Sequence, residues 1–110
     1  MVVHLKSQTP PIRQEPDGSL RVGESRVLLE LVLRAYQDGE TPESIRLRYD
    51  ALSLSDIYGV IAYFLRNRSE IEGYIQSREA LEEKMTERME KEQANLPFFR
   101  EHLKRTNIGL

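Results

Sequence analysis

Residues that could do chemistry are few in this chain of 110 residues. The two histidines, His4 and His102, lie near opposite ends, and neither has a neighbour at the spacing of a metal site or a catalytic triad. Cysteine is absent, which excludes disulfides and thiolate ligands. Ser53, Ser55 and Ser69 suit helix caps and have no base beside them. We therefore expect a protein that is not an enzyme, with no catalytic residue, no metal and no cofactor.

The charged side chains indicate a solvated surface rather than a catalytic site. Charged residues make up 31% of the chain, and the net charge of −2 gives no global basic field to attract nucleic acid. The carboxylates beyond Leu81 alternate with Lys and Arg, which indicates a solvated helix face. No stretch approaches the ~20 apolar residues of a membrane span, and the first residues lack the apolar run of a signal peptide. We expect a cytoplasmic protein that does not enter a membrane.

Five arginines are the candidate contacts to DNA. Base edges are read chiefly by Arg, Lys, Asn and Gln, and a two-stranded ribbon from a dimer can enter the major groove. The alternative is ordinary surface charge, which keeps the edges of strands soluble. The candidates are Arg13, Arg21 and Arg26 near the N-terminus and Arg46 and Arg48 further on.

The elements that position these residues begin with a β arm over residues 1–26. Asp17-Gly18 separates the short runs IRQ and LRV, and Asp-Gly between such runs is a strong hairpin signal because Gly accepts a positive φ. An isolated hairpin is only marginally stable in water. This one must therefore pack on the helices or pair with a second chain.

Residues 27–68 predict a trihelical core in the form of a helix-turn-helix. The first helix spans 28–38, and Gly39 suits the position just past its end. Thr41 can cap the second helix with Pro42 in its first turn, and Ser53 can cap the third. The expected apolar faces are Leu28, Leu29, Leu31, Val32, Ala35 and Tyr36 in the first helix, Ile45, Leu47 and Tyr49 in the second, and Leu54, Ile57, Val60, Ile61, Phe64 and Leu65 in the third.

The third helix is a poor candidate for reading DNA. In a helix-turn-helix the N-terminal residues of this helix face the base edges. Here those positions hold Ser55, Asp56, Tyr58 and Gly59, and the first cation on the helix is Arg66. The helix looks like a core helix.

Residues 69–110 predict a long charged helix and a short helical tail. Ser69 and Glu72 form a capping box, so we expect the fourth helix to start at Ser69. Arg78 and Arg88 interrupt a coiled-coil seam, so we do not expect a long coiled coil between two copies of this helix. Beyond Pro97 the tail either docks on the chain's own core or offers apolar anchors to a partner, and the anchors would be Leu96, Phe98, Phe99 and Leu103.

The fold class is thus mainly α, with a small N-terminal β-hairpin arm, a trihelical helix-turn-helix core, a long C-terminal helix and a short helical tail. The core is small for the length, and a hairpin beside an amphipathic helix leaves apolar surface to bury. A homodimer is expected on these grounds.

The order of these pieces resembles the bacterial family catalogued as domain of unknown function 433, over roughly residues 10–77. The matching motifs are G-x-x-R-V, L-x-L-V-L, G-x-T-P-E-S-I, Y-x-x-L-S-L-x-D-I-Y and A-Y-F-L, in that order. The resemblance implies a homeodomain-like or winged-helix-like fold. It also implies an antitoxin that partners a small PIN-like nuclease toxin.

Three functions follow as expectations. The first is an antitoxin-like protein that binds and neutralises a nuclease. This first function can include binding to operator DNA. The second is a DNA-binding transcriptional regulator without a toxin partner, whose affinity would fall steeply with salt. The third is a dimeric structural module with no specific ligand.

Overall fold

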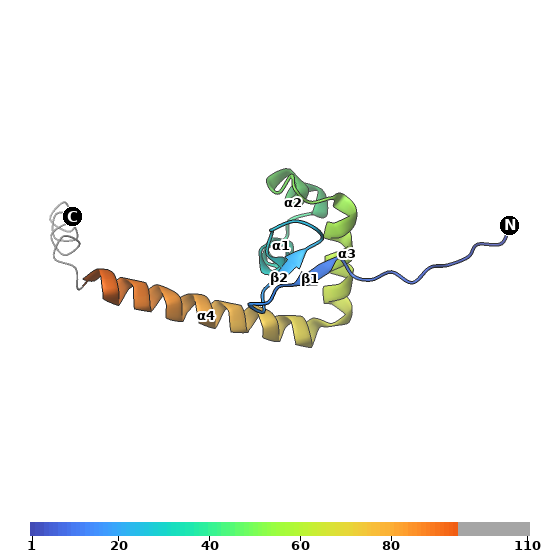
Figure 1. Cartoon of the computed structure of the whole chain (residues 1–110). Coiled ribbons are helices and arrows are strands. Elements are labelled where there is room, and N and C mark those ends of the chain that lie inside the picture. Colours follow the sequence, from blue (N-terminus) through green and yellow to red (C-terminus); the bar gives the residue numbers. More distant parts are fainter. Residues whose placement is uncertain (95–110) are drawn as a thin grey trace. The chain divides into compact units, whose positions relative to one another are not determined.

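The computed structural model describes residues 1–94, which form a two-stranded hairpin and four helices (Figure 1). The elements are β1 (Ile12–Gln14), β2 (Leu20–Val22), α1 (Leu29–Gln37), α2 (Pro42–Arg48), α3 (Leu54–Arg66) and α4 (Arg68–Ala94). The mainly helical class with an N-terminal hairpin and a long C-terminal helix is confirmed. The expected helical tail lies outside the described residues. The chain divides into two compact units between Ile71 and Glu72, a boundary inside α4.

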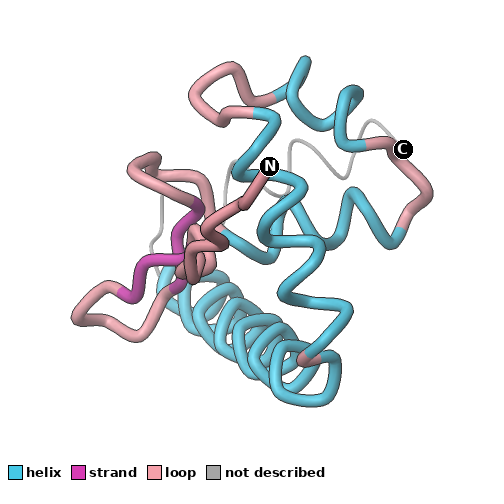
Figure 2. The backbone as a smooth tube through the Cα atoms, turned by 90° about the vertical axis from the view of Figure 1, so that its right-hand side faces the viewer, coloured by secondary structure: helices cyan, strands magenta, loops and turns pink. Residues whose placement is uncertain are grey.

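The hairpin forms where Asp17-Gly18 predicts it. The strands pair antiparallel with Arg13 opposite Arg21, and Figure 2 shows them side by side. Gly18 has φ +89°, and the Asp17 carboxylate accepts hydrogen bonds from the backbone N–H and the hydroxyl of Ser19, at 2.9 and 2.7 Å. Ser19 is fully buried. The hairpin belongs to the first unit and contacts α1 and α3 through β2.

Helix α1 differs from the prediction in which residues it buries. Leu29, Val32, Leu33 and Ala35 are buried, at the spacing of one helical face. Leu31, predicted on this face, is exposed, because two residues of an α-helix turn the chain by about 200° and so carry it away from both Leu29 and Leu33. Glu30 is instead fully buried in the first turn, and the hydrophobic pattern shows no sign of this.

The predicted caps of α2 and α3 are confirmed. Thr41 Oγ1 accepts a hydrogen bond from the backbone N–H of Ser44 at 3.1 Å, with Pro42 as the first residue of α2. Ser53 Oγ accepts from the backbone N–H of Asp56 at 3.0 Å. In Figure 1, α2 lies near the N-terminal end of α3.

The prediction is wrong for two core leucines. Leu47 is 83% exposed, because the seven-residue α2 turns only one narrow face inward and Ile45 occupies it. Leu65 is half exposed on α3, whereas Ile57, Val60, Ile61 and Phe64 form the buried face. Phe64 meets the Tyr36 ring edge-on at 6.5 Å between centroids, and the Arg68 guanidinium lies over the Phe64 ring at 5.3 Å.

The start of α4 also differs from the prediction. Helix α4 begins at Arg68, so Ser69 lies in its first turn rather than at its cap. The joint is one residue, Asn67, whose side-chain amide donates to the Tyr63 carbonyl at 3.0 Å while its own carbonyl accepts from the N–H of Ile71. The break near Asn67 is confirmed, and this short joint leaves no room for the predicted cap. Within residues 1–94, no helix is long and apolar enough to cross a membrane.

Candidate functional site

Helix α3 carries apolar side chains on its outer face as well as on its inner one. Tyr58, Ala62 and Leu65 follow one another at i, i+4 and i+7, the spacing of one helical stripe. Tyr58 is 48% exposed, Leu65 is 50% exposed and Ala62 is exposed between them. We call these three residues the outer stripe. These three side chains do not bury the core, and apolar residues that follow one another on an exposed helix face are candidates for contact with a partner.

Tyr58 is held in place by α2. Its hydroxyl donates a hydrogen bond to the Glu43 carboxylate at 2.5 Å. This bond lowers the pKa of Glu43, since the hydroxyl stabilises the charged carboxylate, and it raises the pKa of Tyr58 for the same reason. A carboxylate therefore lies beside the outer stripe, and it would repel a DNA phosphate.

Leu47 extends the apolar surface onto α2. It lies four residues after Glu43, which places it on the same side of α2 as the carboxylate that Tyr58 reaches. Arg48, next in sequence, pairs with Glu40 at 2.6 Å, and the Glu40 charge raises the pKa of Arg48. Arg46 is exposed.

The arginines of the hairpin support the backbone more than they face outward. Arg13 donates from Nη1 to the Gly23 carbonyl at 2.5 Å and from Nη2 to the Ser25 carbonyl at 3.0 Å, and it also pairs with Glu15. Arg21 donates to the Arg26 carbonyl at 2.5 Å. These contacts fix the turn between β2 and α1. Arg26 is exposed and is therefore the best placed of the three to bind a phosphate.

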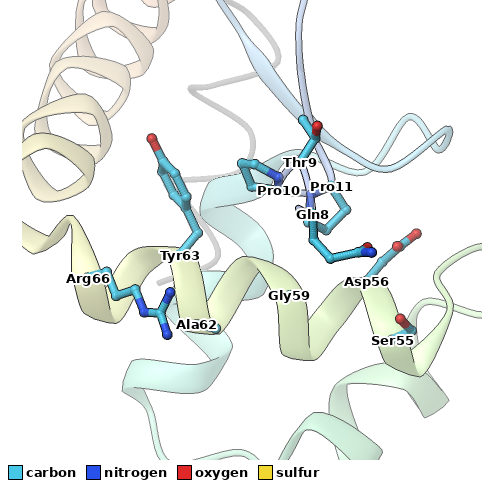
Figure 3. Close-up of a pocket in the computed structure, with 10 residues that line it drawn as sticks. All are labelled: Gln8, Thr9, Pro10, Pro11, Ser55, Asp56, Gly59, Ala62, Tyr63 and Arg66. Carbon is cyan, nitrogen blue, oxygen red and sulfur yellow. The ribbon is translucent and has the colours of Figure 1, made fainter. Parts of the chain in front are cut away.

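A groove runs between the N-terminal segment and α3, with a volume of about 380 Å³ (Figure 3). Pro11 lies against Gly59, so closely that a Cβ there would come within 2.9 Å of the proline ring. Asp56 and Arg66 lie toward opposite ends of the groove. The arm therefore lies along one flank of α3, and Ala62 of the outer stripe is itself one of the residues that line the groove.

Asp56 is also part of the contact between the arm and α3. Gly23 has φ +55°, and a Cβ at this position would collide with the Asp56 carboxylate. The Gly23 N–H donates to the Pro11 carbonyl at 2.8 Å. The first turn of α3, which would face the bases in a groove-reading helix, is thus packed against the chain's own arm.

The predicted anchors of the tail fall outside the part of the chain that the structure describes. Leu96, Phe98, Phe99 and Leu103 lie outside the described residues, as does His102. His4 is exposed in the N-terminal segment. Over residues 1–94, no group of three or more His, Cys, Asp or Glu side chains is arranged to hold a metal ion.

The outer stripe is the feature that sequence reasoning missed. The sequence LSDIYGVIAYFLR could have indicated it, because this stretch contains more apolar residues than fit on the one buried face of α3. A prediction that allows the helix only one stripe assigns Leu65 to the core. Comparison of the chain with family models, with curated proteins and with solved structures finds no match.

Proposed function

We propose that this protein is a non-enzymatic, antitoxin-like module of the cytoplasm, which binds a partner protein through the outer face of its helix-turn-helix. The observation that carries the proposal is the outer stripe, Tyr58, Ala62 and Leu65, exposed on the helix that would otherwise read DNA. Exposed apolar surface of this kind is typical of protein interfaces, where aromatic residues are enriched and charged residues are depleted at the centre.

The same face argues against reading of bases by α3. The exposed positions hold no Arg, Lys, Asn or Gln before Arg66, at the end of the helix. Glu43 adds a negative charge beside Tyr58, and the arm packs on the first turn. A protein partner needs apolar contact and a few polar groups, and both are present here.

The class of partner comes from the resemblance given above, which implies a small PIN-like nuclease. Such an enzyme must bind a phosphate backbone, and Lys and Arg side chains are the groups that neutralise phosphates. Glutamates outnumber Lys and Arg along α4, which suits this charge. The anchors predicted in the tail, Leu96, Phe98, Phe99 and Leu103, would add a second contact to the outer stripe.

The test is purification of the tagged full chain from its native host after nuclease treatment, with the co-purifying proteins identified by mass spectrometry. The expected result is a small nuclease in stoichiometric amount, whose activity the pure chain inhibits. Leu65→Glu should weaken inhibition by at least about tenfold, because it places a charge in an apolar contact. Leu31→Glu, at an exposed leucine on α1, is the matched control and should leave inhibition unchanged.

Two other results would replace the proposal. Equal inhibition by folded Leu65→Glu and Leu31→Glu would remove the outer stripe from the interface. Absence of a nuclease, together with DNA binding that weakens steeply with salt and is lost in Arg26→Ala or Arg46→Ala, would establish the regulator instead.

A further inference from the structure

Helix α4 carries an exposed apolar ridge in its second half. Leu81, Met85 and Met89 are each about half exposed. Their spacing of four residues sets them in one row along the helix, and rows of this spacing are the ridges by which helices pack on one another. Ile75, earlier on the same helix, is buried, so the exposed ridge begins where burial ends. We call Leu81, Met85 and Met89 the α4 ridge.

Charges flank the ridge in a regular order. Arg78 and Glu92 lie seven residues before and after Met85, and Glu82 and Arg88 lie three residues before and after it. Offsets of three and seven residues return to the same side of a helix, so these four side chains border the ridge. The four charges are therefore arranged symmetrically about Met85 with opposite sign. Arg78 corresponds to Glu92, and Glu82 corresponds to Arg88, at equal numbers of residues from Met85.

We propose that the α4 ridge binds a second copy of the same helix, antiparallel, with Met85 opposite Met85 of the second copy. This arrangement sets Arg78 against Glu92 of the second copy and Glu82 at the level of its Arg88. Leu81 meets Met89 of the second copy, so the apolar centre is closed at both ends by opposite charges. Two-fold symmetry makes every contact between different residues occur twice.

The charges select this orientation over the alternative. A parallel pair in register would set Arg78 against Arg78 and Glu92 against Glu92, and like charges in contact are unfavourable. In the antiparallel pair, Glu83 lies at the same height along the helix as Glu87 of the second copy. Both side chains lie on the opposite side of the helix from Met85, so they are away from the contact. Arg78 and Glu82 each already have an interaction within their own chain, and contacts with the second copy would add to those interactions.

The size of the contact sets the strength of the dimer. The paired stretch from Arg78 to Glu92 spans roughly 20 Å at about 1.5 Å per residue. Such a short two-helix contact buries less surface than a standard stable interface. The dimer is therefore weak, and its population depends on protein concentration.

The test is sedimentation equilibrium of the full chain over a concentration series. Wild type should show a monomer–dimer equilibrium, and Met85→Glu should abolish it. Arg78→Glu should weaken association by at least about tenfold, because two like-charge contacts replace two attractive ones. The double variant Arg78→Glu with Glu92→Arg should restore association, since it only exchanges the two charges. Lys91→Glu changes the net charge as Arg78→Glu does, lies away from the ridge, and should associate like wild type.

Orientation can be measured separately because the chain has no cysteine. Chains with Leu81→Cys are mixed with chains carrying Met89→Cys and oxidised mildly. The expected product is the mixed disulfide between the two variants. A preference for disulfides that join two Leu81→Cys chains would overturn the antiparallel arrangement.

Three outcomes of the sedimentation series would overturn the proposal itself. The first is a wild type that stays monomeric at every concentration. The second is a Met85→Glu variant that still dimerises. The third is a failure of the charge exchange between positions 78 and 92 to restore association.

Discussion

At the scale of residues, the bond between Tyr58 and Glu43 couples the outer stripe to pH. The pKa of Glu43 is lowered from 4.5 in the folded chain, so the bond stabilises the fold above that pH and is lost as pH falls through the lower value. The pKa of Tyr58 is raised from 10.0, so its contribution is complete below that pH and is lost as pH rises through the higher value. The contact is therefore intact across the neutral range.

Tyr58→Phe tests this coupling directly. Removing the hydroxyl should bring the pKa of Glu43 up toward its ordinary value, because the carboxylate loses its main donor. The measurement is the carboxyl ¹³C shift of Glu43 against pH by NMR in both proteins. Identical midpoints for Glu43 would mean that the bond does not persist in solution.

At the scale of elements, two glycines inside helices allow the effect of helix propensity on stability to be measured apart from the effect of contact with the arm. Gly73 in α4 has open space where a Cβ would lie, and Gly59 in α3 has the Pro11 ring at 2.9 Å. Gly73→Ala should raise the free energy of unfolding by roughly 0.5–1 kcal/mol, the usual gain of alanine over glycine in a helix. Gly59→Ala should gain less or lose stability, because Pro11 must move. Urea denaturation measures both variants, and an equal gain at Gly59 would show that the arm does not pack there.

The elements themselves were largely predictable, because their signals are local. Asp17-Gly18, Thr41-Pro42 and Ser53 each act through hydrogen bonds to backbone groups within three residues, and sequence shows such neighbours directly. The exposure of Leu47 and the burial of Glu30 depend instead on which helix packs over them, and periodicity cannot supply that. For the candidate site, the poor base-reading positions of α3 were visible in sequence. The outer stripe required a structure, since it depends on which apolar face was already used.

At the scale of the whole molecule, the two proposed surfaces lie in different compact units. The outer stripe belongs to the unit that ends at Ile71, and the α4 ridge belongs to the unit that begins at Glu72. Neither surface is needed to bury the core of the first unit, whose centre is Phe64 with residues of α1 to α3. Binding of a partner and self-association are therefore expected to be separable by single substitutions.

A crossed experiment measures this separation. Met85→Glu should yield a monomer that still inhibits the partner nuclease. Any loss of inhibition should be no larger than the gain in apparent affinity that a dimer obtains from binding with two copies at once. Leu65→Glu should lose inhibition while its monomer–dimer constant stays that of wild type. Both quantities are measured on each variant, by sedimentation equilibrium and by titration of nuclease activity, with circular dichroism to verify helix content. If Met85→Glu abolishes inhibition at concentrations where wild type is itself monomeric, the ridge contacts the nuclease rather than a second copy. If Leu65→Glu instead alters the dimer constant, the outer stripe is part of the self-association surface.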